Sequence, residues 1–511
     1  MRKILKTTAL ISILTFTSRV LGVVRDALIA MYFGTSSQSD AFFIAFRPFD
    51  LVRKLFSDGI LSMAFVPVFA KTMEKQGKSK AVAMVFSFFC FLSLTGIIIL
   101  LAGIYFAPVI VKLIAPGFIG DSYRSGLAIV LLKIMLPYLW LVFITALCMG
   151  VLNSMGNFGV PAAAPAVFNL VVILFTIIIS NHFKIPITGL ALGVTIGGVL
   201  QLAVQVPVMV RLGMLNPCFF QFFHPGVLKV MKIMIPCMIG AASYQINIMV
   251  ASFFASKLDE GSVSFIYYAD RLVQFPLALF AVSVSTALLP ELSRKAVSGK
   301  LDEIAKFFSD GVKLVLFITI PAMAGLMALD EKIVAFLFGH GAFSALAIKQ
   351  TAECLVILSS GLWAFTGTRL FVTLYYALSI IRVPFYSGVI ATGLNLVFCW
   401  MSVGILGLKG LVLSVSLSAM IGFVFLFVNI PGAMKIDKFE IIVSACRSLF
   451  LSVIMFFLVR QAADFILAKG HDKFWSAAGV LGCIGFGMIF YLGVNMLIKS
   501  PELKMLKKRR S

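Results

Sequence analysis

The sequence predicts an all-α polytopic membrane protein with about fourteen transmembrane helices. Of its 511 residues, 61% are hydrophobic, and the mean hydropathy is +1.06. Soluble domains contain only about 45–50% apolar residues, because a globule needs a wettable surface. Apolar runs of about 20 residues, each able to cross about 30 Å of hydrocarbon as a helix, recur along the whole chain. Alternating segments of about 10 residues, which are typical of a transmembrane barrel, are not seen.

The expected spans follow one another through short turns, without a low-complexity linker. The start of the chain, MRKILKTT, resembles the start of a secretion signal. The apolar run continues through Arg19, Arg25 and Asp26 without a small-residue cleavage site, so we expect a retained helix. The spans lie near residues 8–33, 38–70, 82–114, 125–152, 159–180, 188–210, 227–256, 264–292, 306–336, 347–377, 384–405, 409–431, 440–468 and 474–498.

The formal net charge of +22 is concentrated in alternate loops. This positive-inside bias predicts a multi-pass membrane protein with both termini in the cytoplasm. The same distribution argues against a nucleic-acid partner, and we expect the basic C-terminal tail to contact anionic lipid headgroups. The basic loops contain Arg2, Lys3 and Lys6; Lys71, Lys75, Lys78 and Lys80; Arg294, Lys295 and Lys300; Lys435 and Lys438; and Lys504, Lys507, Lys508, Arg509 and Arg510.

An internal repeat of about six helices divides the chain. Residues 40–71 align without gaps on residues 263–294, and Pro67 and Pro290 have the same separation as Pro161 and Pro384. Six spans are an even number, so both copies face the same way, as in transporters built from parallel repeats around a midplane cavity. The sequence therefore predicts an N-terminal six-helix lobe at 1–220, a C-terminal six-helix lobe at 221–434, and two additional helices with the basic tail at 435–511.

Charged residues within the predicted spans need an explanation, because each costs about 2.5–3.5 kcal/mol at the centre of a membrane helix. In the first span, Ser12, Thr15, Arg19, Gly22 and Asp26 share one helical face, with Ser18 and Arg25 beside it. The second span contains Asp40, Arg47, Asp50, Arg53, Lys54 and Asp58, and the eighth contains Ser264, Tyr267, Asp270, Arg271 and Gln274.

Two interpretations of these charges remain open. One is a network of internal ion pairs that fixes helix packing. The other is a cationic cavity for an anionic substrate, in which carboxylates orient guanidinium groups that bind phosphate oxygens bidentately. The arginines outnumber the nearest carboxylates, which favours the anion site. The expected substrate-binding residues are Ser18, Arg19, Arg25, Asp26, Asp40, Arg47, Asp50, Arg53, Ser264, Asp270 and Arg271.

Other function classes have weaker support. A small cation could be bound by the side-chain oxygens of Gln245, Asn247, Thr392 and Asn395. Amides, however, also form hydrogen bonds between membrane helices. The four histidines fall in predicted loops, the eight cysteines form no C-x-x-C pair, and no complete phosphate-binding loop occurs. The sequence thus predicts no catalytic residue, metal or cofactor, which disfavours an enzyme. Long, repeat-related helices disfavour a channel.

Several motifs resemble a known family. They are S-R-x-L-G-x-x-R-D at 18–26, S-D-A-F-F-x-A-F at 39–46, A-F-V-P at 64–67 and G-S-V-S-x-x-Y-Y-A-D-R-L-x-x-F-P at 261–276. Together they closely resemble the MurJ/MviN family of lipid II flippases in the MOP superfamily, and the resemblance covers essentially the whole chain.

The resemblance implies transport of lipid II, the undecaprenyl-pyrophosphate-linked disaccharide-pentapeptide, from the cytoplasmic to the periplasmic leaflet. It implies that the last two helices line a groove for the lipid tail and that membrane lipids are partners; the cell-wall synthesis machinery is a further candidate. The alternative is an exporter of another lipid-linked oligosaccharide or a drug-like substrate. The energy source stays open. The implied cavity residues are the arginines Arg19, Arg25 and Arg271, the acids Asp26 and Asp40, and the serines Ser18 and Ser264.

The chain also departs from the family pattern. The family usually has Pro-Asn-x-x-Arg-Arg with a later Glu, and another Glu after the Ala-Asp-Arg motif. Here the corresponding residues are Asp50, Lys54, Asp58 and Gln274. The roles that the resemblance implies are therefore open at these four positions.

Overall fold

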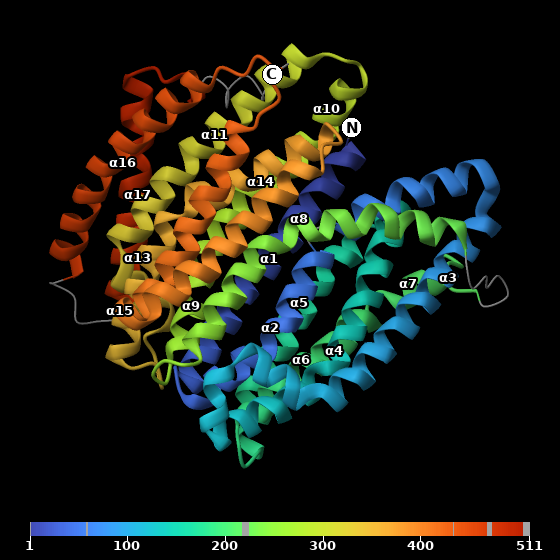
Figure 1. Ribbon diagram of the computed structural model, residues 1–511, viewed down its shortest axis with the longest axis horizontal. Helices are drawn as coiled ribbons and strands as arrows, with labels where there is room; N and C mark the ends of the chain where they lie inside the picture. The colour runs from blue at the N-terminus through green and yellow to red at the C-terminus, as the bar shows by residue number, and fades with distance from the viewer. Residues whose placement is uncertain (1, 58–59, 217–223, 433, 468–472, 504–511) are drawn as a thin grey trace. The chain divides into compact units, whose positions relative to one another are not determined.

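The computed structural model describes residues 2–57, 60–216, 224–432, 434–467 and 473–503, and every regular element in these ranges is a helix (Figure 1). The chain forms two compact units. The N-terminal unit contains Met1–Gln245, Asp259–Ser264 and Gly341–Phe343, and the C-terminal unit contains Ile246–Leu258, Phe265–His340 and Ser344–Ser511. The chain passes from one unit to the other within two helices, between Gln245 and Ile246 and between Ser264 and Phe265. The lobe boundaries inferred from the repeat stay a prediction.

The N-terminal unit is a bundle of long helices with short connections. Tyr138 stacks on Phe168 with ring centroids 5.2 Å apart, which joins α4 to α5. Its elements are α1 (Arg2–Phe33), α2 (Ser37–Ser57), α3 (Ile60–Ile114), the 3₁₀ turn η1 (Pro116–Gly120), α4 (Ser122–Ser154), α5 (Gly159–Leu174), the π-helical turn η2 (Phe175–Ile179), the 3₁₀ turn η3 (Ser180–His182), α6 (Ile187–Ala203), α7 (Val206–Arg211) and the first part of α8 (Pro225–Ala255).

The C-terminal unit has the same all-helical character. Its elements are the end of α8, α9 (Ser262–Pro276), the π-helical turn η5 (Leu277–Val282), α10 (Ser283–Val297), α11 (Leu301–Ala328), α12 (Asp330–Phe338), α13 (Ala345–Ser360), α14 (Leu362–Ala377), α15 (Arg382–Val428), α16 (Lys438–Leu467) and α17 (Lys473–Leu497). The first residues of α9, up to Ser264, belong to the N-terminal unit.

Two helices contain a break at a glycine. Gly77 in α3 has a φ of +82°, and Gly407 in α15 has a φ of +53°. Positive φ is a conformation that glycine adopts without the steric cost that a side chain adds. Both breaks fall between predicted spans, at 70–82 and 405–409, so each long helix is two successive segments joined at a glycine.

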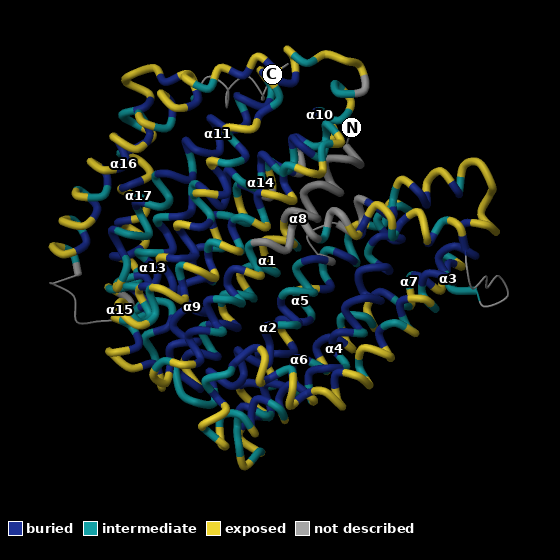
Figure 2. Tube along the Cα trace, in the orientation of Figure 1, coloured by how far each residue is buried: buried dark blue, intermediate teal, exposed yellow. Residues whose placement is uncertain are grey.

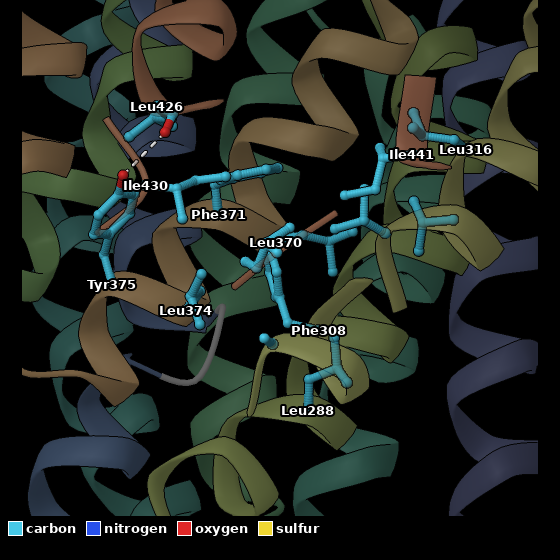
Figure 3. Packing of buried hydrophobic residues seen from close by; sticks show 14 of the residues in the cluster. Leu288, Phe308, Leu316, Leu370, Phe371, Leu374, Tyr375, Leu426, Ile430 and Ile441 are labelled. Carbon is cyan, nitrogen blue, oxygen red and sulfur yellow. Dashed lines mark hydrogen bonds between the residues drawn. The ribbon is translucent and has the colours of Figure 1, made fainter. Parts of the chain in front are cut away.

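An apolar core joins α10, α11, α14 and α15 in the C-terminal unit (Figure 3). Phe308 meets Phe371 edge to face, with ring centroids 5.0 Å apart. The buried hydroxyl of Tyr375 donates to the carbonyl oxygen of Leu426 at 2.9 Å, which satisfies the polar group inside the core (Figure 3). Edge-to-face pairs contribute beyond the burial of their area, so this cluster fixes the four helices together.

Helices α16 and α17 lie side by side and also contact α11 (Figure 1). Lys313 of α11 is only 4% exposed, and its Nζ lies 2.8 Å from Oε1 of Glu440 at the start of α16. Exposed residues recur along α16 (Figure 2). Large apolar side chains such as Phe450 and Phe457 are among them. Apolar side chains directed outward along a whole helix are expected where the surrounding solvent is lipid.

Within the described residues, nine helices are long and apolar enough to cross a membrane. The pair α13 and α14, bent by 44°, raises this to as many as ten if it forms one span. The all-helical membrane fold that the sequence predicts is confirmed, whereas the count of about fourteen stays a prediction.

Candidate substrate-binding site

Arg25 is held by partners from two helices of the N-terminal unit. Its Nε and Nη2 donate to Oδ1 of Asp26 at 2.9 and 2.6 Å, and its Nη1 donates to Oδ1 of Asn169 at 2.9 Å. The Nδ2 of Asn169 donates in turn to the main-chain oxygen of Ser18 at 3.0 Å. Arg25, Asp26 and Asn169 are all at least nine-tenths buried. The guanidinium therefore has a defined orientation.

Asp50 organises a second group of cations on α2. Its Oδ1 accepts from Nη2 of Arg53 at 2.7 Å, and its Oδ2 lies 3.0 Å from Nζ of Lys54. Lys54 also donates to Oε1 of Gln245 at 3.1 Å. The three charges share one helical face because they are three and four residues apart. Asp50 is 2% exposed while the Arg53 side chain is about one-third exposed, so the outer charge of this group is positive.

Asp40 contacts a helix end. Its Oδ2 accepts from the backbone N–H of Gly261 at 2.8 Å, and its Oδ1 accepts from the backbone N–H and the hydroxyl of Ser264 at 2.9 and 2.6 Å. These groups form the first turn of α9, where backbone N–H groups have no helical partner and the helix dipole favours a negative charge. Asp40 therefore caps the first turn of α9.

The other predicted residues of the N-terminal unit are Arg19, which is half-buried on α1, and Arg47, which is 5% exposed on α2. Between residues 18 and 57 the chain has five basic residues (Arg19, Arg25, Arg47, Arg53 and Lys54) and three acidic ones (Asp26, Asp40 and Asp50). This part of the membrane-embedded bundle thus has an excess of positive charge. Asp58 lies outside the described residues.

The predicted residues of the C-terminal unit lie on α9. The Nη2 of Arg271 donates to the hydroxyl of Tyr267 at 2.8 Å, and the guanidinium carbon lies 4.5 Å from the centre of that ring. Asp270 is buried and accepts a hydrogen bond from Nε2 of Gln274. Gln274 stands where the family usually has a glutamate. Its amide donates a hydrogen bond to Asp270, whereas a glutamate would place a second carboxylate there.

Several of the eleven predicted residues thus form local groups. The structure brings together Arg25 with Asp26, Asp50 with Arg53, and Asp40 with Ser264, and it connects Ser18 to Arg25 through Asn169. The pairs within α2 follow from their spacing in the sequence. The joining of residues distant in sequence does not, since it depends on which helices pack together.

The residues proposed for a small cation have hydrogen bonds of a different kind. Gln245 accepts from Lys54, and Nδ2 of Asn395 donates to the main-chain oxygen of Asn247 at 2.9 Å. These are bonds between helices, which was the alternative interpretation of the amides. In the described part of the chain, no group of three or more His, Cys, Asp or Glu side chains is suited to a metal.

Asn169 is a residue that the sequence analysis missed. It is a single amide in the otherwise apolar α5. The signal that marks it is the cost of a polar group among membrane helices: an amide at that depth needs a hydrogen-bonding partner. The identity of the partner could not be found in the sequence, because α1 and α5 are separated by more than a hundred residues.

Comparison with known proteins gives a consistent result. The family described as lipid II flippase MurJ matches residues 29–469. The probable lipid II flippase MurJ of Vibrio cholerae is 32% identical over 519 residues, which cover 99% of this chain and 98% of that protein. The lipid II flippase MurJ of Burkholderia cenocepacia is 32% identical over 429 residues, 83% of each chain.

Solved structures show the same fold. A lipid II flippase MurJ in an inward closed conformation superposes with a TM-score of 0.78 at 27% identity, covering 96% of this chain and 99% of the other. A multidrug resistance MATE family transporter of the MOP superfamily, in an inward-facing conformation, has a TM-score of 0.68 at 12% identity, covering 87% and 96%. The second likeness concerns the fold alone. The chain is a multi-pass membrane protein that belongs to the lipid II flippase MurJ family.

Proposed function

We propose that this chain translocates lipid II, the undecaprenyl-pyrophosphate-linked precursor of peptidoglycan, from the cytoplasmic to the periplasmic leaflet of the bacterial inner membrane. Membership of the lipid II flippase MurJ family over most of the chain supports this assignment. The protein acts as a transporter and not as an enzyme. Translocation requires that the site open to each side in turn, which is the alternating-access cycle of transporters built from repeats.

The observation that carries the proposal is the set of oriented guanidinium groups on membrane-embedded helices. Arg25 is held by Asp26 and Asn169, and Arg53 by Asp50. A planar guanidinium binds two phosphate oxygens at once and stays charged when it is partly removed from water. A pyrophosphate is the part of lipid II with the geometry and the charge that such groups recognise.

The charged residues of the predicted site, and Ser264, have proposed roles. Arg19, Arg25, Arg47 and Arg53 attract and hold the pyrophosphate, and Arg271 contacts it during the transport cycle. Asp26, Asp50 and Asp270 orient the side chains beside them, while Asp40 and Ser264 fix the start of α9. The additional helices α16 and α17 line a groove for the lipid tail, and both termini lie in the cytoplasm.

The proposal is tested by complementation of a bacterial strain with conditional depletion of its own lipid II flippase. We expect the chain to restore growth and to prevent lipid II from accumulating in the inner leaflet. The control is Arg460→Ala, which removes an exposed guanidinium of α16 that lies over Phe456; we expect it to behave as the wild type.

Failure of a normally inserted protein to restore growth would argue against the assignment. Binding of lipid II no tighter than that of a neutral glycolipid by the purified protein would replace the assignment with an exporter function. Selective binding of lipid II together with restored growth would support the flippase.

A further inference from the structure

The amide of Asn169 joins two parts of the candidate site in the N-terminal unit. Its oxygen accepts from Nη1 of Arg25 at 2.9 Å, and its nitrogen donates to the main-chain oxygen of Ser18 at 3.0 Å. Ser18 is seven residues before Arg25 on α1, so one side chain of α5 contacts both the backbone of α1 and the tip of its buried arginine. Both hydrogen-bonding groups of this 7% exposed amide are thereby satisfied.

The contacts leave part of the guanidinium available. An arginine side chain has five N–H groups. Asp26 accepts from Nε and Nη2, and Asn169 accepts from Nη1, which accounts for three of them. One N–H on Nη1 and one on Nη2 remain beyond these bonds, and these two nitrogens form the end of the planar fork that grips a phosphate.

The neutrality of Asn169 matters for the charge of the site. Asp26 already contributes one negative charge against Arg25. A second carboxylate at position 169 would place two negative charges on one guanidinium, and an incoming anion would then be repelled. An amide holds the same nitrogen by a hydrogen bond and adds no charge.

The amide also packs closely on α1. A Cβ placed on Gly22 would lie 3.6 Å from Nδ2 of Asn169, which is ordinary van der Waals contact. Because the side chain rests directly on the α1 backbone, its oxygen is aimed at Arg25 by packing as well as by the bond to Ser18. A group held in this way is preorganised, so little rearrangement is needed when a ligand arrives.

We propose that Asn169 is a positioning residue for anion binding: it fixes the Arg25 guanidinium with a neutral acceptor and so preserves the positive charge that receives the pyrophosphate. The inference rests on the proposed function, since it concerns the same site. It adds a residue of α5 to that site and assigns the reason for an amide at this position.

The alternative is that Asn169 only ties α5 to α1, and two substitutions separate the two roles. Asn169→Ala removes both hydrogen bonds. Asn169→Asp has nearly the same shape and keeps an acceptor for Arg25, but it loses the N–H that donates to Ser18 and adds a negative charge. We therefore expect the two variants to rank differently in the two measurements. The melting temperature falls from wild type to Asn169→Asp to Asn169→Ala, whereas the affinity for the pyrophosphate falls from wild type to Asn169→Ala to Asn169→Asp.

The experiment uses the purified full chain, with undecaprenyl pyrophosphate as the probe and undecaprenol as the uncharged comparison. Asn169→Asp is expected to weaken binding of the pyrophosphate by about tenfold or more, because like charges are then brought together. Binding of undecaprenol should not change. The matched control is Thr195→Val, which removes another interhelical bond in the same unit, from the Thr195 hydroxyl to the main-chain oxygen of Ile134 at 2.7 Å. It should lower the melting temperature and leave binding of the pyrophosphate unchanged.

Two results would overturn the inference. If Asn169→Asp binds the pyrophosphate at least as well as Asn169→Ala, Asn169 serves only to pack α5 against α1. If Thr195→Val weakens binding as much as Asn169→Asp does, the effect is a general consequence of loosened helices. Failure of the wild type to prefer the pyrophosphate over undecaprenol is a separate outcome, which overturns the proposed function together with the inference.

Discussion

Single carboxylates among the membrane helices have two kinds of partner. Asp26 and Asp50 face arginine and lysine side chains, whereas Asp40 accepts three hydrogen bonds from Gly261 and Ser264 at the start of α9. The first kind sets the direction of a cation. The second satisfies backbone donors that would otherwise be left without a helical acceptor.

The capping role of Asp40 can be tested by substitution. Ser264→Ala removes one of the three bonds, and we expect a loss of about 1.5–3 kcal/mol, typical of a hydrogen bond to a charged group. Asp40→Ala removes all three bonds and leaves buried backbone donors unpaired, so its melting temperature should be lower still. Thermal unfolding of the purified variants in detergent measures both. Equal melting temperatures for the two variants would contradict the capping role.

At the scale of elements, glycines decide how closely two connections approach. The backbone N–H of Ala342 donates to the main-chain oxygen of Met31 at 2.8 Å, and Gly34 and Gly341 flank this contact with φ values of +58° and +60°. A Cβ on Gly341 would lie only 2.3 Å from the Met31 oxygen. The close contact between the end of α1 and the segment Gly341–Phe343 therefore requires glycine.

Gly341→Ala is expected to destabilise this contact for two reasons, strain and collision. Gly299 has a similar φ of +70° but nothing within 4 Å of a Cβ, so Gly299→Ala suffers strain alone. We expect about 1–2 kcal/mol for Gly299→Ala, the usual cost of a left-handed conformation, and clearly more for Gly341→Ala. Melting temperatures of the two variants give the difference. If they fall equally, the predicted collision does not occur.

The attachment of α16 to α11 depends on an ion pair of unequal burial. Lys313 is 4% exposed, while the Glu440 side chain is 55% exposed, and Asp310 is a more distant second partner at 3.4 Å. Removing the exposed acid leaves a buried ammonium with weaker compensation, whereas removing the lysine leaves a carboxylate that water can solvate.

We therefore expect Glu440→Ala to lower the melting temperature more than Lys313→Met, which replaces the buried cation with an apolar side chain of similar length. Thermal unfolding at two salt concentrations measures the effect, and the difference should persist at high salt because the lysine is buried. A larger loss in Lys313→Met would show that the ion pair is a net stabilising interaction.

At the scale of the whole molecule, the repeat predicts that both halves of the chain contribute guanidinium groups to transport. Arg25 lies in the N-terminal unit and Arg271 in the C-terminal unit. Lysine preserves the charge at either position but replaces the planar fork with a compact point charge. We expect Arg25→Lys and Arg271→Lys each to fail in complementation of a flippase-depleted strain while reaching normal membrane levels. Normal growth of both variants would refute bidentate capture of the pyrophosphate by these arginines.

The sequence by itself determined the solvent of this protein, its helical class and the ion pairs that form within one helix. These properties are local: apolar runs partition into lipid, and Asp50 meets Arg53 and Lys54 because they are one turn apart. The family motifs added the expected substrate.

Only the tertiary structure decided the partners of residues distant in sequence. Asp40 caps a helix that begins more than two hundred residues later. Asn169 on α5 accepts a hydrogen bond from Arg25 on α1, more than a hundred residues earlier in the chain. In lipid every buried polar group must find a partner inside the protein, so the sequence indicates that these side chains have partners. Which partner each one has depends on the helices that pack together and on their rotation about their own axes, and helical periodicity within one segment contains neither.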